Sequence, residues 1–419
     1  MTITPEKFSV IQKLKSEVLA SIDKLAPTLI EVSQSLHANP ELAFEEHDSV
    51  ALLCAKSRAE GLDIEQPAFG LETAFRSDFG NLEGPCIAIL SEYDALPNIG
   101  HACGHNIIAA IGLGTALALK QLGQQLPGRV RYMGTPAEER GAGKELMAQA
   151  GAFEGIDAAM MVHPAGVNLR AVRTLCLSEV KVTFHGKQAH AGAYPENGIN
   201  ALDALVLSYQ AIGALRQHIR TNERVHGVFT KAGETPNVVP DQTSAWFFVR
   251  AGTASALKDL KPRVAACFQG GAKATGCTVE LEWTQADYLN MLVNEPLAAA
   301  YESNARVIGV SEFTPYEAFA TATTDMGNVS HRVPVLHPTI ACAPPSVTIH
   351  DPDFANWAGS EKGNEAVIFG AKALALTAID YLTDQNLRDQ TAQAFHEIKQ
   401  APVTPVDESG KQPAMCGCC

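Results

Sequence analysis

Two side chains of metal-binding type, Cys103 and His105, stand two positions apart in the segment HACGHN at residues 101–106. The segment follows an apolar run at 86–90, typical of a buried strand, and precedes a stretch rich in glycine, alanine and leucine, typical of a helix. A thiolate and an imidazole can bind one cation together, and a helix N-terminus favours the thiolate. We therefore expect Cys103 and His105 to be metal ligands.

Two later segments repeat this context. A candidate strand at 130–133 is followed by Glu138 and Glu139, and an apolar run at 158–162 is followed by His163. The carboxyl ends of neighbouring parallel strands lie at one edge of a sheet, where ligands bind. The three segments therefore predict one site, although a single buried cysteine or histidine is more often structural.

The pair Glu138-Glu139 suits hydrolysis. Adjacent carboxylates repel each other unless a cation or a proton separates their roles. One of them can bind a metal while the other takes a proton from water and passes it to the leaving amine. An exposed acidic pair at a helix start is the alternative interpretation.

His350, in the segment TIHDP, completes the set of candidate ligands. On its own it could be a loop residue. Five N, O and S ligands are too many for a closed structural tetrahedron, and they suit two catalytic cations that share a bridge. Zinc fits these ligand types, and manganese, cobalt and nickel are alternatives.

Composition and charge narrow the classes of protein. The chain has 419 residues, of which 46% are hydrophobic and 19% charged, and its formal net charge is −14. An acidic chain without a basic patch is not expected to bind nucleic acid. Ten cysteines, mostly scattered singly, favour reduced thiols over a disulfide framework. No apolar stretch of membrane-spanning length and no signal peptide are recognised, so we expect a cytoplasmic protein without a membrane partner.

Periodicity divides the chain into segments. Apolar strands alternate with helices up to about residue 175, which predicts an α/β domain with a mostly parallel sheet. A β-α-β-β-α-β order then indicates an inserted ferredoxin-like domain with a half-exposed sheet. The expected divisions are 1–177 and 289–398 for the catalytic domain, 178–288 for the inserted domain, and 399–419 for a disordered tail whose end carries Cys416, Cys418 and Cys419.

Several motifs together resemble those of the M20 metallopeptidases and amidohydrolases, in particular the branch with aminobenzoyl-glutamate hydrolase and M20 dipeptidases. They occur in the family's order along nearly the whole chain: YDALP at 93–97, GHACGHN at 100–106, PAEE at 136–139, HGKQAHA at 185–191, PNVVP at 236–240 and TDMGNVS at 324–330.

The resemblance implies a role for each candidate residue. The implied metal ligands are Cys103, His105, Glu139, His163 and His350, with Cys103 as the bridge. Glu138 is implied as the general base, Asp94 as the group that orients a ligand, and His190 as an oxyanion-stabilising residue that reaches the partner subunit's site. Asn237 and Arg250 would hold the substrate carboxylate, and the inserted domain would form a homodimer. His190 and Arg250 could instead be ordinary surface residues.

Arg140 departs from the pattern, because this branch usually has glycine after the glutamate pair. A guanidinium here could pair with Glu138 and lower its basicity, or could contact an acidic substrate. We expect a small-molecule amide substrate: an N-acyl amino acid, an aminoacyl dipeptide or an aryl amide. Deamination of a small aromatic acid, and metal-dependent binding without turnover, are the alternatives.

Overall fold

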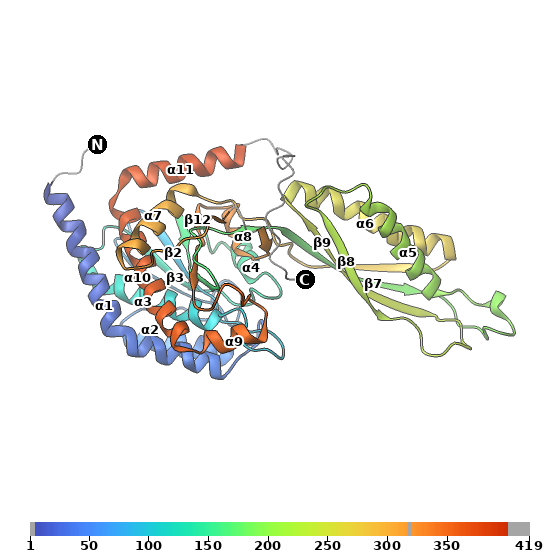
Figure 1. The fold of residues 1–419 in the computed structure, drawn as a ribbon. Helices are drawn as coiled ribbons and strands as arrows, with labels where there is room; N and C mark the ends of the chain where they lie inside the picture. Colours follow the sequence, from blue (N-terminus) through green and yellow to red (C-terminus); the bar gives the residue numbers. More distant parts are fainter. Residues whose placement is uncertain (1–4, 317–319, 401–419) are drawn as a thin grey trace. The chain divides into compact units, whose positions relative to one another are not determined.

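A computed structural model describes residues 5–316 and 320–400 of the protein (Figure 1). The described chain divides into two compact units. The first contains the residues up to Arg173 and those from Met291 onward, and the second runs from Thr174 to Asn290.

The first unit is built on a five-stranded sheet with strand order β1-β3-β2-β4-β12. Its strands are β1 (Phe75–Gly80), β2 (Cys86–Ser91), β3 (Arg129–Gly134), β4 (Ala158–Met160) and β12 (Val335–Leu336). Only the edge pair β1 and β3 is antiparallel among these strands. The strands β2, β3 and β4, which the apolar runs predicted, are adjacent and parallel, so their carboxyl ends meet at one edge as expected.

Both faces of this sheet are covered. All six residues of β2 are buried, and they alternate between two cores. Ile87 and Ile89 join a core that includes the helices α3 and α10, whereas Ala88 and Leu90 join a second core with Met147. Burial on both faces explains why the strand reads as a continuous apolar run.

The described part of the first unit also contains nine helices and several short elements. The helices are α1 (Pro5–Ala38), α2 (His47–Ala59), α3 (His105–Gln121), α4 (Gly143–Gln149), α7 (Glu295–Val307), α8 (Met326–Ser330), α9 (Pro352–Ala358), α10 (Glu361–Thr383) and α11 (Gln385–Gln400). The short elements are η1 (Gly123–Gln125), β5 (His163–Ala165), β6 (Arg173–Thr174), β11 (Ala320–Ala322) and β13 (Thr339–Ala341).

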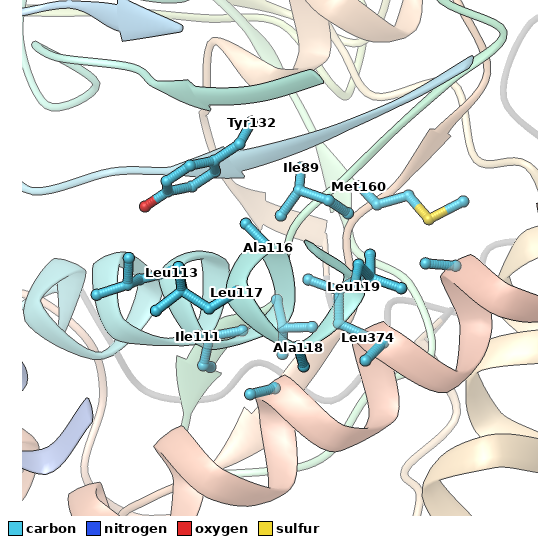
Figure 2. Packing of buried hydrophobic residues seen from close by; sticks show 14 of the residues in the cluster. Ile89, Ile111, Leu113, Ala116, Leu117, Ala118, Leu119, Tyr132, Met160 and Leu374 are labelled. Atoms are coloured by element: carbon cyan, nitrogen blue, oxygen red, sulfur yellow. The ribbon is translucent and has the colours of Figure 1, made fainter. Parts of the chain in front are cut away.

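The helix α3 begins at a predicted ligand and is buried along nearly its whole length. Figure 2 shows it between Ile89 of β2 on one side and Leu374 of α10 on the other. Small residues allow this close packing: a Cβ atom at Gly112 would lie 2.2 Å from Oγ of Ser91. Truncation of a leucine here, such as Leu117, should cost about 2–5 kcal/mol of stability, so the start of the helix is firmly held.

The closing helix α10 corrects one expectation from the sequence. It has the length and the mean hydropathy, 1.4, of a membrane-crossing segment, although no such stretch was expected. In the structure 72% of this apolar window is buried inside the protein. Its apolar character is that of a central core helix.

The second unit has the predicted ferredoxin-like order. It consists of β7 (Cys176–His185), α5 (Ala201–Arg216), β8 (Arg224–Lys231), β9 (Gln242–Ala251), α6 (Ala254–Thr275) and β10 (Thr278–Trp283), with the short helix η2 (Pro195–Asn197). Its antiparallel sheet has the order β10-β7-β9-β8. Inward residues of β9 are buried and alternate with half-exposed ones, as the period of two predicted.

Residues 335–341 form two short strands, β12 and β13, because Pro338 lacks the N–H group that a continuous ladder needs. One expectation near the C-terminus was wrong in detail. The tail was expected from residue 399, but α11 continues to Gln400. The remainder of that tail, with its three cysteines, lies outside the described residues.

Candidate metal centre

The predicted ligands of the first unit converge at the carboxyl edge of its sheet. Cys103 and His105 flank Gly104, which adopts a left-handed conformation with φ of 79°. A Cβ atom at Gly104 would lie 2.5 Å from a side-chain atom of Pro164, so glycine alone fits this turn. The turn therefore brings Cys103 towards His163, with 3.4 Å between Sγ and Nε2.

The donor atoms form groups of the size that holds a metal ion. Sγ of Cys103 lies within 4.8 Å of donors from His105 and His163 in one group, and of donors from Glu139 and His350 in another. All five predicted ligands are thus brought together, and the thiol is common to both groups. His350 is half-exposed, whereas the other four are largely enclosed.

Two buried atoms that could bind a metal ion lack hydrogen-bond partners. Nε2 of His105 and Oε1 of Glu139 are both buried and have no hydrogen-bond partner. Burial of such atoms is costly unless something binds them. Sulfur, imidazole nitrogen and carboxylate oxygen suit zinc, so the residues present fit two divalent cations.

Asp94 contacts two of the candidate ligands. Its Oδ1 atom lies 3.1 Å from Nδ1 of His105, and its Oδ2 atom accepts the backbone N–H of Glu139 at 2.9 Å. Burial alone would raise the pKa of Asp94, but the charge and hydrogen bond of His105 and the N–H of Glu139 lower it. The carboxylate form is therefore favoured, which directs Nε2 of His105 towards the other ligands.

Glu138 lies beside this group and is 7% exposed. Burial and the carboxylates of Glu92 and Glu139 hold the pKa of Glu138 well above its usual range. A raised pKa and a place next to a candidate cation site are the properties of a group that accepts and returns a proton.

Hydrogen bonds to its backbone hold the loop that carries Glu138 and Glu139 in place. Ala137 has a φ of 59°, in the left-handed region, and its N–H donates to the buried carboxylate of Glu46 at 2.8 Å. Gly143 closes the loop with an N–H bond to the carbonyl of Ala137 at 3.1 Å. A side chain at Gly143 would overlap the carbonyl oxygen of Pro136.

Sequence reasoning missed three buried residues behind the site, namely Glu92, Lys144 and Asp325. Nζ of Lys144 lies 2.5 Å from Glu92 and 2.7 Å from Asp325. Glu92 and Asp325 stand inside or beside motifs that were recognised, but they received no role. No local pattern marks Lys144 as a buried residue.

Three predicted residues lie in the second unit. His190 is exposed, and its Nδ1 atom accepts the backbone N–H groups of Gly192 and Ala193 at 3.2 and 3.1 Å. Asn237 is also exposed, and its carbonyl accepts the N–H of Ala191, which places the two predicted loops side by side. Arg250, on β9, is half-buried and stacks on Phe248.

Arg140 directly follows the glutamate pair in the first unit, and its side chain is exposed. Its predicted pairing with Glu138, or with an acidic substrate, remains a prediction. The exposed position is compatible with contact to a molecule that enters the site.

Comparison with known proteins identifies similar chains. Residues 88–365 match the family described as Peptidase family M20/M25/M40. The chain is 37% identical over 401 residues to the Xaa-Arg dipeptidase of Mus musculus, with 92% of this chain and 93% of the relative covered. It is 27% identical over 444 residues to a subunit of p-aminobenzoyl-glutamate hydrolase from Escherichia coli (strain K12), with 88% and 92% covered.

A solved structure has the same fold. A dinuclear metal-binding peptidase of the M20 family from Bacillus subtilis matches with a TM-score of 0.63 at 23% sequence identity. The match covers 86% of this chain and 99% of that protein.

Proposed function

Because the chain belongs to the M20/M25/M40 peptidase family and is therefore a hydrolase, we propose that it is a two-metal dipeptidase. The proposed substrate is a dipeptide with a basic C-terminal residue. The similarity to an Xaa-Arg dipeptidase over nearly the whole chain supports this choice.

The observation that carries the proposal is the position of Cys103. Its thiol belongs to two donor groups, one with His105 and His163 and one with Glu139 and His350. A thiolate shared by two groups is suited to bridge two cations. When bound, two such cations supply Lewis acidity to the amide carbonyl and to water.

The residues of the chain then divide the remaining work. Glu138 removes a proton from water and returns it to the leaving amine nitrogen. Asp94 fixes His105 and the backbone of Glu139, so that these ligands keep their orientation when substrate binds. Burial of Glu138 excludes bulk water and strengthens its interaction with neighbouring charges.

The second unit supplies the other proposed contacts. His190 of a second copy stabilises the oxyanion of the tetrahedral intermediate, and Asn237 of that copy holds the substrate carboxylate. Arg250 lies at the other end of β9 from Gln242 and the His190 loop, so it would hold the same carboxylate from the first copy. The contact between the two loops supports a joint role of His190 and Asn237, because His190 forms an isolated antiparallel bridge with Val238, the residue after Asn237.

A homodimer is part of the proposal, and β8 is the surface that would form it. This strand is an edge of the described sheet, and seven of its eight residues are exposed. Val228 and Phe229 are 60% and 40% exposed, and Phe229 lines an apolar cavity with Val206 and Tyr209 of α5. A free strand edge beside exposed apolar side chains suits pairing with a second copy of itself.

A substrate panel tests the function. The zinc-loaded chain should hydrolyse dipeptides such as Ala-Arg and Ala-Lys faster than Ala-Glu, N-acetyl amino acids and p-aminobenzoyl-glutamate, with kcat/KM measured for each. Faster hydrolysis of p-aminobenzoyl-glutamate or of the N-acetyl compounds would contradict the dipeptidase assignment.

A further inference from the structure

Lys144 is a fully buried lysine held between two carboxylates. Its Nζ atom lies 2.5 Å from Oε1 of Glu92 and 2.7 Å from Oδ1 of Asp325, and neither carboxylate residue is more than 1% exposed. The backbone N–H of Lys144 also donates to Oδ2 of Asp325 at 2.8 Å. A buried lysine is costly unless its charge is paired, and here both its side chain and its backbone are fixed.

The carboxylates around Lys144 form a group of cation-binding type. Oxygen atoms of Glu92, Glu138 and Asp325 lie within 4.8 Å of one another. Carboxylate oxygens are common ligands of divalent cations, and three of them repel one another unless a positive charge or a proton intervenes. The ammonium of Lys144 provides such a charge.

This group adjoins the candidate metal centre. Oε2 of Glu92 lies 3.6 Å from Nε2 of His105, and Oε2 of Glu138 lies 3.7 Å from the same atom. Lys144 and the candidate metal ligand His105 therefore contact the same carboxylate, that of Glu92. A change of charge at Lys144 is expected to alter how the centre binds cations.

We propose that Lys144 is a positioning residue that serves as a built-in cation of the site. Its ammonium holds Glu92 and Asp325 in place, and it takes the position at which these carboxylates and Glu138 would otherwise bind a further divalent ion. This role rests on the proposed two-metal function. It keeps Glu138 available for proton transfer, because a further ion would bind that carboxylate.

The chain contains a matched control. Glu145, the next residue, joins α4 to α8 because its Oε2 atom accepts the side-chain N–H of Asn328 at 2.9 Å. Both of its carboxylate oxygens also lie 2.7 Å from guanidinium nitrogens of Arg332, which follows α8. Lys144 joins the same two helices through Asp325, the residue that precedes α8. The Glu145→Gln substitution therefore weakens the contact between α4 and α8. It leaves the charges of Lys144 and of the surrounding carboxylates, Glu92, Glu138 and Asp325, unchanged.

The test compares Lys144→Ala and Lys144→Met with Glu145→Gln and the natural chain. Each protein is equilibrated with zinc, and zinc per chain is measured by mass spectrometry of the metal content. We expect two ions in the natural chain and in Glu145→Gln, and three in Lys144→Ala. Millimolar propylammonium should displace the third ion and restore dipeptide hydrolysis, because it replaces the missing ammonium.

The second variant addresses folding. Methionine fills the space of Lys144 without its charge, so Lys144→Met should bind its zinc about tenfold more tightly than the natural chain, since a positive charge near the ions is gone. The proposal is overturned if Lys144→Ala stops at two ions, or if it binds three and propylammonium neither displaces the third ion nor changes hydrolysis. Should Lys144→Ala fail to fold, unchanged or weaker zinc binding in Lys144→Met overturns it. If instead the natural chain binds no zinc pair, the proposed two-metal function has failed.

Discussion

The carboxylate of Asp94 lies 3.1 Å from Nδ1 of His105, and both side chains are fully buried. The same carboxylate accepts the backbone N–H of Glu139. A single residue thus sets the orientation of two candidate metal ligands that come from different loops.

Replacement of Asp94 by alanine should weaken zinc binding by about 10- to 100-fold, as expected when the partner of a ligating histidine is lost. Competition with a chromophoric chelator measures this affinity. Asp78→Ala is the control, because Asp78 pairs with Arg131 on the same sheet without contact to the candidate ligands. Equal affinities of the natural chain and Asp94→Ala would remove Asp94 from the site.

Cys103→Ala should lose zinc and activity together, because the thiolate is proposed to bridge both ions. Cys54→Ala serves as the control, since Cys54 is equally buried but lies on α2 in the hydrophobic core. Metal content and turnover are measured on the same samples. Full occupancy by two ions without Cys103 would refute the bridge.

The stabilising effect of zinc should grow with pH. Among the protein groups alone, burial lowers the pKa of His105, but the charges of Cys103 and Asp94 outweigh it and raise that pKa well above the usual value. For Glu138, burial itself raises the pKa. Both groups bind more protons in the folded than in the unfolded chain, so without metal the free energy of unfolding falls as pH rises past their unfolded pKa values.

Protons and zinc compete for the same atoms, so zinc binds more strongly as the pH rises and the protons leave. The difference in thermal midpoint between the zinc form and the chelator-treated form should be larger at pH 8 than at pH 6. A difference that shrinks or stays constant over this range would argue against these ligands.

The proposed dimer predicts a link between assembly and turnover. Phe229→Glu places a charge on the apolar surface that β8 forms with α5. It should give monomers that keep two zinc ions but lose turnover, because His190 of a second copy is absent. Val307→Glu is the control, since Val307 is 77% exposed and lies in the first unit. Sedimentation velocity and kcat are measured together, and a fully active monomer would exclude action of His190 across subunits.

Most of the site was predictable from the sequence because its ligands follow strands. Cys103, Glu139 and His163 each stand after an apolar run, and parallel strands bring such positions to one edge. Their backbone supports, such as Gly104, are part of the same motif. The β-α-β-β-α-β order of the second unit could equally be predicted, because apolar and polar residues alternate along its strands.

Other features depend on tertiary contacts that no local pattern records. Lys144 lies in the short helix α4, and tertiary packing buries it between Glu92, which follows β2, and Asp325, which precedes α8. The apolar length of α10 reads like a membrane span until its neighbours are known. The helix α11 is polar, with Thr391 as its buried residue, so periodicity gave little sign of it.

The central claim is that Glu138 acts as the proton-transfer group of a two-metal amide hydrolase. The most direct measurement is kcat for a dipeptide together with zinc content in Glu138→Gln. The account predicts two ions per chain and a kcat that is lower by about 10² to 10⁴, the usual contribution of a positioned general base. Near-natural turnover at full zinc occupancy would contradict it.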